Sequence, residues 1–177
     1  MKVVAIGRGS LGGALAALWR EAGHDVTELG REGGDASGTD AVLLAVPSES
    51  VADAIARVSG LDGIPVMDAT NPVRVARPDG FDSIALYVKS LTGGPVAKAF
   101  NTNYARIFDR LAETTERPSM LYAADDEARA VTETLIRDAG FDPVDAGDLS
   151  AARAVEDFVE VVFAVVNQRG PFLYRIY

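Results

Sequence analysis

Cysteine is absent from the 177-residue sequence. Its absence excludes disulfide bonds, thiolate metal sites and thiol nucleophiles, and with them zinc fingers and dithiol redox motifs. A chain without cysteine is suited to a reducing compartment. We therefore expect a cytoplasmic protein that has no metal site.

Positive charge is also scarce, since 17 lysine and arginine residues face 26 aspartate and glutamate residues and the net charge is -9. A nucleic acid or an anionic membrane surface requires a basic patch. No apolar run reaches the roughly 18 residues of a membrane span, and Arg8 interrupts the apolar stretch near the N-terminus. The sequence predicts neither a nucleic-acid partner nor a membrane partner.

Short β-branched segments alternate with longer helical patterns along the chain, which is typical of a parallel sheet with crossover helices. The length and the 48% hydrophobic content fit one core. We predict a single α/β domain over residues 1–177, Rossmann-like and doubly wound, with a mostly parallel sheet and helices on both faces. Strands are expected at 2–6, 25–29, 41–46, 64–68, 96–100, 119–123 and 143–145, and helices at 11–22, 48–58 with Ser48 as cap, 83–91, 104–113, 127–139 and about 149–169.

The connection after the second predicted strand is unusually short. Residues 30–40 are rich in Gly, Asp and Ser. About ten residues cannot hold the crossover helix of a standard Rossmann half. We expect a loop or a single turn there.

The last predicted helix, about 149–169, has Asp148 as its N-cap and stops near Gly170. Its apolar residues cover more than one face, so a helix would expose apolar surface that a second subunit could bury. This pattern predicts a homodimer interface on the helix. A core strand is the alternative interpretation of the same residues.

A glycine-rich motif directly follows the first predicted strand and opens the first helix. A lone GxGxxG is a weak signal, but this position within a βαβ-like unit is typical of dinucleotide binding. The three glycines permit a tight turn, close approach of a pyrophosphate and close helix packing, and the helix N-terminus offers N–H groups to phosphate. The predicted phosphate loop consists of Gly7, Arg8, Gly9, Ser10, Leu11 and Gly12.

The end of the second strand indicates which dinucleotide binds. NAD-binding units usually carry Asp or Glu here, which bonds the ribose 2′-hydroxyl and would repel a 2′-phosphate. Gly30 takes this position and Arg31 follows it, which favours NADP through charge-assisted bonds. A register shift of two residues would make Glu28 or Glu32 the ribose acid and favour NAD. Arg8 is a secondary candidate, either against the adenine or beside Arg31, with a side chain directed to solvent as the alternative. For Arg31 the alternative is a solvated arginine of the loop.

Three later strand ends are expected at the same carboxyl edge, where open α/β sheets bind ligands. Val46 and Pro47 end the third strand and are predicted to lie near the nicotinamide half. Asn71 and Asn101 belong to polar clusters after two further strands and are predicted cofactor contacts. The alternative is that Asn71 and Asn101, like Thr102, only hold turns.

No catalytic side chain is predicted. His24, the only histidine, belongs to a turn expected to be exposed at the opposite edge of the sheet. Lys98 and Tyr104 are possible proton donors, although a lysine at a strand end is more often a surface charge. Arg74 and Arg77 are candidate contacts for an anionic second substrate, with exposed solubilising charge as the alternative.

Several segments taken together resemble one family. They are the glycine loop, Ala-Thr-Asn-Pro at 69–72, Lys-Ala-Phe-Asn-Thr at 98–102, Gly-Phe-Asp-Pro-Val-Asp-Ala-Gly at 140–147 and Ala-Arg-Ala-Val-Glu at 152–156. The set resembles the NADPH-dependent oxidoreductases of the deazaflavin coenzyme F420, from residue 1 to about 160. The tail at 170–175 also resembles that family, more weakly.

This resemblance implies reversible hydride transfer between NADP and coenzyme F420, with both rings stacked in a cleft of a small, usually dimeric protein. Two stacked rings held in contact can exchange hydride without an acid–base residue. The family pattern assigns phosphate binding to 7–12, the 2′-phosphate site to Gly30 and Arg31, and the nicotinamide side to Val46 and Pro47. The short 30–40 connection and Arg8 in the glycine loop depart from it.

Two other functions fit the same residues. A reductase could pass hydride from NADPH to a different small molecule, such as a flavin, an imine or a metal-ion complex. A non-catalytic NADP sensor could use the cofactor to change its dimerisation through the C-terminal helix.

Overall fold

The computed structural model describes residues 1–73 and 75–177. Its strands are β1 (Lys2–Ile6), β2 (Asp25–Leu29), β3 (Gly34–Asp35), β4 (Ala41–Leu44), β5 (Val58–Ser59), β6 (Val66–Asp68), β7 (Val96–Lys98), β8 (Ser119–Ala124) and β9 (Asp142–Asp145). Its α-helices are α1 (Ser10–Glu21), α2 (Val51–Ala56), α3 (Ile84–Thr92), α4 (Asp126–Asp138) and α5 (Ala152–Arg169). Short 3-10 segments cover Ser48–Ser50, Ala105–Glu113 and Leu149–Ala151.

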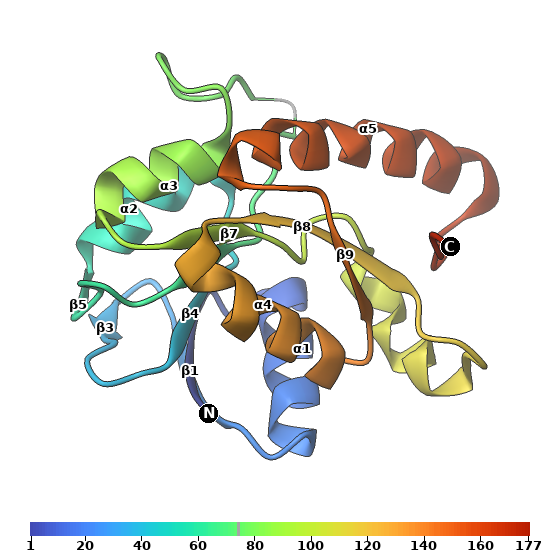
Figure 1. Cartoon of the computed structure of the whole chain (residues 1–177), viewed down its shortest axis with the longest axis horizontal. Helices are drawn as coiled ribbons and strands as arrows, with labels where there is room; N and C mark the ends of the chain where they lie inside the picture. The colour runs from blue at the N-terminus through green and yellow to red at the C-terminus, as the bar shows by residue number, and fades with distance from the viewer. Residues whose placement is uncertain (74) are drawn as a thin grey trace.

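A seven-stranded sheet in the order β2-β1-β4-β6-β7-β8-β9 forms the middle layer (Figure 1). The first five strands in this order are parallel, β8 runs antiparallel to β7, and β9 is parallel to β8. The mostly parallel, Rossmann-like sheet predicted from the sequence is therefore confirmed. The carboxyl ends of β1, β4, β6 and β7 meet at one edge.

Helices cover both faces of this sheet, as predicted (Figure 1). Val3 and Ala5 of β1 belong to the core that α1 and α4 close with Trp19 and Leu135. The alternate residue Val4 belongs to the core on the other face, beneath α2, α3 and α5. Both faces of the central strands are buried, which explains their continuous apolar runs.

The short connection at 30–40 contains no crossover helix, as expected, but it is more than a loop. Its strand β3 pairs in parallel with β5 to make a separate two-stranded sheet. Gly33 has φ +76°, and a Cβ there would lie 2.0 Å from the Arg57 carbonyl oxygen. Only glycine lets the two segments approach this closely.

The helix predicted over 48–58 is wrong at both ends. A 3-10 turn precedes α2, which has only six residues, and Val58 belongs to β5. Ser48 does not cap the helix, since its hydroxyl donates to Glu49 Oε2 at 3.4 Å. Pairing between β3 and β5 explains the early end of α2. The segment predicted as a helix over 104–113 is a 3-10 segment with a kink at Ile107.

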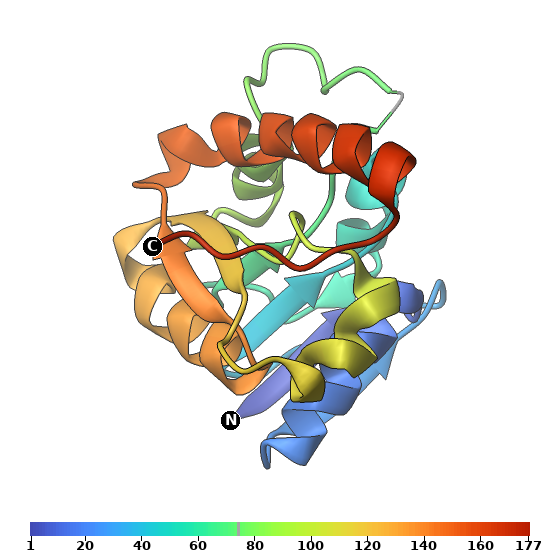
Figure 2. The same ribbon diagram turned by 90° about the vertical axis from the view of Figure 1, so that its right-hand side faces the viewer.

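The last long element is a helix, and the alternative interpretation as a core strand is wrong. Asp148 accepts a hydrogen bond from the Ser150 amide at 2.9 Å, and Gly170 follows the last turn with φ +78°. After α5 the chain turns back, and the Ser119 amide donates to the Tyr174 carbonyl oxygen at 2.8 Å (Figure 2). Within the described residues, no helix combines the length and apolarity needed to cross a membrane.

Candidate nucleotide-binding site

The glycine loop between β1 and α1 forms an open cradle. A Cβ at Gly7 would lie 2.2 Å from the Ala45 carbonyl oxygen, and one at Gly12 would lie 2.0 Å from the Gly7 carbonyl oxygen. At Gly9 no protein atom lies within 4 Å of the Cβ position. Gly7 and Gly12 therefore bring backbone segments together, whereas Gly9 leaves space through which a pyrophosphate can approach.

The N-terminus of α1 points amide groups into this cradle. Gly9 is its N-cap residue and supplies no side-chain oxygen, so the first N–H groups of the helix have no cap partner. Ser10 and Leu11 belong to that first turn. Unpaired amides at a helix N-terminus are suited to bind an anion.

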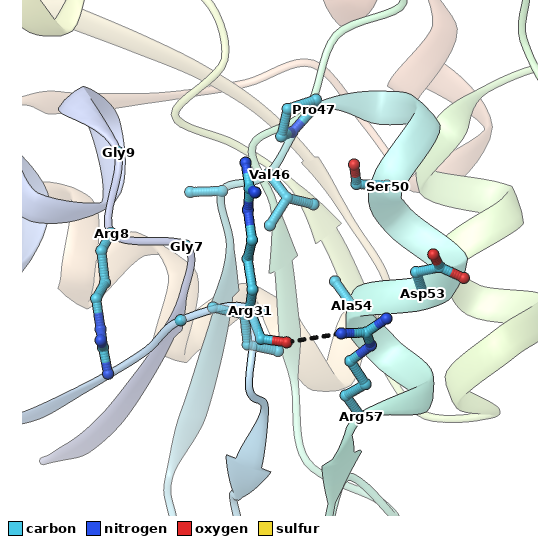
Figure 3. A pocket seen from close by; sticks show the side chains of 13 residues that line it. Gly7, Arg8, Gly9, Arg31, Val46, Pro47, Ser50, Asp53, Ala54 and Arg57 are labelled. Carbon is cyan, nitrogen blue, oxygen red and sulfur yellow. Dashed lines mark hydrogen bonds between the residues drawn. The ribbon is translucent and has the colours of Figure 1, made fainter.

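A cavity of about 470 Å³ lies over the ends of β1, β2 and β4 (Figure 3). The structure brings most of the predicted cofactor contacts together around it. Its predicted lining residues are Gly7, Arg8, Gly9, Gly30, Arg31, Val46 and Pro47, and Ser50, Asp53, Ala54 and Arg57 from the α2 region also line it.

The strand register places Gly30 as predicted. Ile6 of β1 pairs with Leu29 of β2, so Gly30 is the first residue beyond the strand. The alternative register, shifted by two residues, is not observed. Glu28 lies inside β2, where its Oε1 accepts a hydrogen bond from Arg20 Nη1 at 2.8 Å.

Two arginines lie near the predicted ribose end. Figure 3 shows the Arg31 side chain extended along the cavity and Arg57 on its α2 side. Arg57 Nη1 donates to the Arg31 carbonyl oxygen at 2.9 Å. Sequence reasoning missed Arg57, because only the pairing of β3 with β5 brings it beside Arg31.

Arg8 is engaged beside Gly30, in the wall of the same cavity. Its guanidinium donates to the Glu28 carbonyl oxygen at 3.2 Å and to Glu32 Oε1 at 2.7 Å. Hydrogen bonding from its own backbone amide and the neighbouring Arg8 charge lower the pKa of Glu32. The two side chains therefore form an ion pair at neutral pH.

Two further cavities continue the first along the sheet edge. A cavity of about 350 Å³ shares Ala45, Val46 and Pro47 with the nucleotide cavity. It shares Leu11 and Asn71 with a third cavity of about 270 Å³. The three neighbouring cavities above the strand ends are together called the trough.

The third cavity has mainly apolar and aromatic walls. Val159, Val162 and Phe163 come from α5, and the Tyr104 ring lies edge-on to Phe163 with centroids 6.5 Å apart. A planar ring fits such walls, because aromatic side chains favour stacked or edge-on contacts.

The predicted residues Asn71 and Asn101 lie together where the second and third cavities join. Asn71 Nδ2 donates to the Asn101 carbonyl oxygen at 2.9 Å, and Asn101 Nδ2 donates to Asn71 Oδ1 at 2.8 Å. Each therefore holds the other strand-end turn, as the turn-forming alternative expected. Phe100, just before Asn101, has φ +63°, an unusual backbone for a bulky residue.

Lys98 is not the surface charge that its place at a strand end suggested. Its side chain is 0% exposed, and Nζ lies 2.6 Å from Asp68 Oδ2 and 3.1 Å from Glu156 Oε1. It also donates to the Thr70 carbonyl oxygen at 2.7 Å. Lys98 therefore holds the backbone of Thr70, which lines the second cavity, and is itself too deeply buried to contact a ligand.

The other residues singled out in the sequence are not part of the site. Arg77 binds Glu156 and Asp157; burial alone would lower the pKa of Arg77, but these hydrogen bonds raise it. Arg74 lies outside the described residues. His24 precedes β2 at the opposite sheet edge, but its side chain is only 7% exposed because it binds Asp138 at 2.8 Å, so the expected exposure is wrong.

Known proteins of this fold include reductases. No known family model and no curated protein sequence matches the chain. A candidate F420-dependent NADP reductase from Arthrobacter sp. FB24 aligns with 100% of this chain and 99% of its own, at 22% identity and a TM-score of 0.81. The hypothetical protein SMa0349 from Sinorhizobium meliloti aligns over 99% and 93%, at 26% identity and a TM-score of 0.72.

An imine reductase from Aspergillus terreus, in complex with NADPH4, aligns over 94% of this chain and 61% of its own, at 15% identity and a TM-score of 0.70. At these identities the likeness concerns the fold. The resemblance to F420-dependent NADP reductases, first indicated by the sequence motifs, is confirmed at that level.

Proposed function

We propose that this protein is an NADP-dependent oxidoreductase that transfers hydride reversibly between NADP(H) and coenzyme F420 by direct stacking of the two rings. The observation that carries the proposal is the trough of three neighbouring cavities. It begins at a phosphate cradle, passes over the ends of β1, β4 and β6, and ends in a cavity with apolar and aromatic residues of α5 and Tyr104 in its walls.

The nucleotide half of the trough fits NADP. The open side of Gly9 and the amides of the first α1 turn suit the pyrophosphate. Gly30 puts no acid side chain of its own at the ribose, and Arg31 and Arg57 supply positive charge beside it. A 2′-phosphate is the group that such a pair of guanidinium groups binds strongly.

The nicotinamide ring would lie over Val46 and Pro47, between the two outer cavities. The ring of the hydride acceptor would lie against Tyr104 and Phe163 in the third cavity. Both rings would then meet above Leu11 and Asn71, which line the second and third cavities alike.

NADPH, when bound, supplies the hydride. The chain contributes orientation and exclusion of water: Asn71 and Asn101 fix two strand-end turns, and the α5 side chains cover the third cavity. Holding two reactants in contact at the correct angle can supply about 7–11 kcal/mol of the barrier reduction. No side chain is required to change its protonation state.

An absorbance assay tests this proposal. Purified protein is mixed with oxidised coenzyme F420 and NADPH, with NADH as the control, and the visible band of the deazaflavin is followed. We expect bleaching with NADPH and much slower bleaching with NADH. NADPH that binds without any bleaching would contradict the assignment of coenzyme F420 as acceptor.

The structural likeness to the Aspergillus imine reductase favours a second candidate, an NADPH-dependent reductase of another small molecule. A cyclic imine or a flavin in place of coenzyme F420 tests it by the loss of NADPH absorbance. Turnover with such an acceptor and none with coenzyme F420 would select this candidate.

A further inference from the structure

Glu32 lies beside Gly30 at the nucleotide end of the trough. A methyl group at Gly30 would be 2.5 Å from Glu32 Oε2 and 3.1 Å from Arg8 Nη1. The carboxylate therefore occupies the space next to the end of β2. In dinucleotide-binding units of this fold, that space belongs to the 2′ position of the adenosine ribose.

The partner of this carboxylate is a guanidinium that also lines the cavity. Arg8 Nη2 donates to Glu32 Oε1 at 2.7 Å, and Arg8 belongs to the glycine loop that faces the pyrophosphate. Carboxylate and phosphate oxygens bind guanidinium groups through the same charge-assisted hydrogen bonds. One anion can therefore replace the other on Arg8.

We propose that Glu32 is a stand-in for the 2′-phosphate: it holds Arg8 in the nucleotide-free protein and yields Arg8 to the phosphate when NADPH binds. The inference rests on the proposed NADPH site. It makes Glu32 a specificity-determining residue that lowers the affinity for NADPH, while NADH, which has no 2′-phosphate, leaves the Glu32–Arg8 pair in place.

Separating Glu32 from Arg8 costs little free energy because the ion pair is exposed to water. The Arg8 and Glu32 side chains are 56% and 62% exposed, so water solvates the carboxylate after it moves. Exposed ion pairs contribute little free energy, and removing one competitor of this kind should raise the affinity for NADPH about two- to fivefold.

Dissociation constants for NADPH and NADH, measured by nucleotide fluorescence on the full chain, test the proposal without any hydride acceptor. Glu32→Gln should bind NADPH about two- to fivefold more tightly and NADH unchanged. In an Arg8→Ala background the same substitution should have no effect, because the competition is for Arg8.

Glu28→Gln is the matched control. It removes the same charge from the neighbouring strand, but its carboxylate is held by Arg20. The ratio of the NADPH and NADH dissociation constants should not change in this variant. A general effect of net charge would instead appear in both variants.

Three results would overturn the proposal. Weaker NADH binding by Glu32→Gln would make Glu32 a ligand of the ribose hydroxyl. An equal gain for both nucleotides, or a gain that persists with Arg8→Ala, would remove the exchange on Arg8. Wild-type protein without any preference for NADPH would instead overturn the NADP assignment itself, and the stand-in with it.

Discussion

At the scale of single residues, three arginines are placed around one cavity of a chain whose net charge is -9. Arg8 lies in the glycine loop, Arg31 follows β2, and Arg57 follows α2. This local cluster can attract an anion although the protein as a whole is acidic. The more distant carboxylates matter little, because charges beyond about 8 Å are largely screened at physiological salt.

Arg31→Ala tests the central member of this cluster. We expect NADPH binding to weaken by about 1.5–3 kcal/mol, the scale of a lost charge-assisted hydrogen bond, and NADH binding to change little. Titration with both nucleotides provides the measurement. Equal losses for the two would remove the 2′-phosphate assignment.

Lys98 shows why part of the site could not be predicted. Asp68 and Glu156 lie 30 positions before and 58 positions after it in the sequence, and only the sheet edge and α5 bring the three side chains together. A lysine at a strand end carries no local sign of this burial. The surface interpretation was therefore reasonable and wrong.

Lys98→Met should destabilise the protein by about 3–5 kcal/mol, because Asp68 would remain as a buried carboxylate without its cation and Glu156 would keep only Arg77. Urea unfolding measures the change. Lys89→Met is the control: the Lys89 side chain is 45% exposed in its ion pair with Asp125, and its loss should cost about 1 kcal/mol or less. If both variants lost a similar free energy of unfolding, the buried cluster would contribute no more to stability than the Lys89 ion pair.

At the scale of elements, most of the fold was predictable because periodicity reports burial directly. The bounds of β1 and β2 agree with the predicted strands, since a glycine follows each of them, Gly7 after β1 and Gly30 after β2. The predictions failed where a strand pairs with a segment that is distant in the sequence. Val58 continues the helical pattern of α2, yet its backbone pairs with Gly34.

The site was predictable to a similar extent. The glycine loop, Gly30 and Arg31 follow from their order along the chain, and the first three loop residues line one cavity with Gly30 and Arg31. Arg57 and the aromatic walls of the third cavity come from elements with no motif. Their placement depends on packing between segments far apart in the sequence.

The glycine loop permits a test that separates folding from binding. A Cβ at Gly9 meets no atom within 4 Å, so the stability of the Gly9→Ala protein should stay within about 0.5 kcal/mol of the wild type. Its affinity for NADPH should fall about tenfold or more, because the methyl group takes the space of the pyrophosphate. Alanine at Gly12 would lie 2.0 Å from the Gly7 carbonyl oxygen and should destabilise the fold by about 1–3 kcal/mol. Unchanged NADPH affinity in Gly9→Ala would argue against pyrophosphate at this loop.

At the scale of the whole molecule, α5 lies across the outside of the sheet layer (Figure 1), and one large apolar side chain of the helix, Val161, faces outward. Val155, Val159 and Val162 are buried, whereas Val161 is 57% exposed. We propose that this outer side forms the interface of a homodimer, because a second copy would remove it from water.

Val161→Glu should convert the dimer to a folded monomer, since the side chain is not part of the monomer core. Light scattering during gel filtration gives the mass. Asn167→Asp adds the same charge on another side of α5 and should leave the dimer intact. A mass that changes with NADPH in the wild type would favour the sensing function over the enzyme.

The most direct test of hydride transfer uses NADPH with deuterium at both positions of nicotinamide C4. After reaction with oxidised coenzyme F420, the account predicts one deuterium on the reduced deazaflavin by mass spectrometry, whichever face of the nicotinamide reacts. Reduced deazaflavin without deuterium would contradict direct transfer between two rings in the trough.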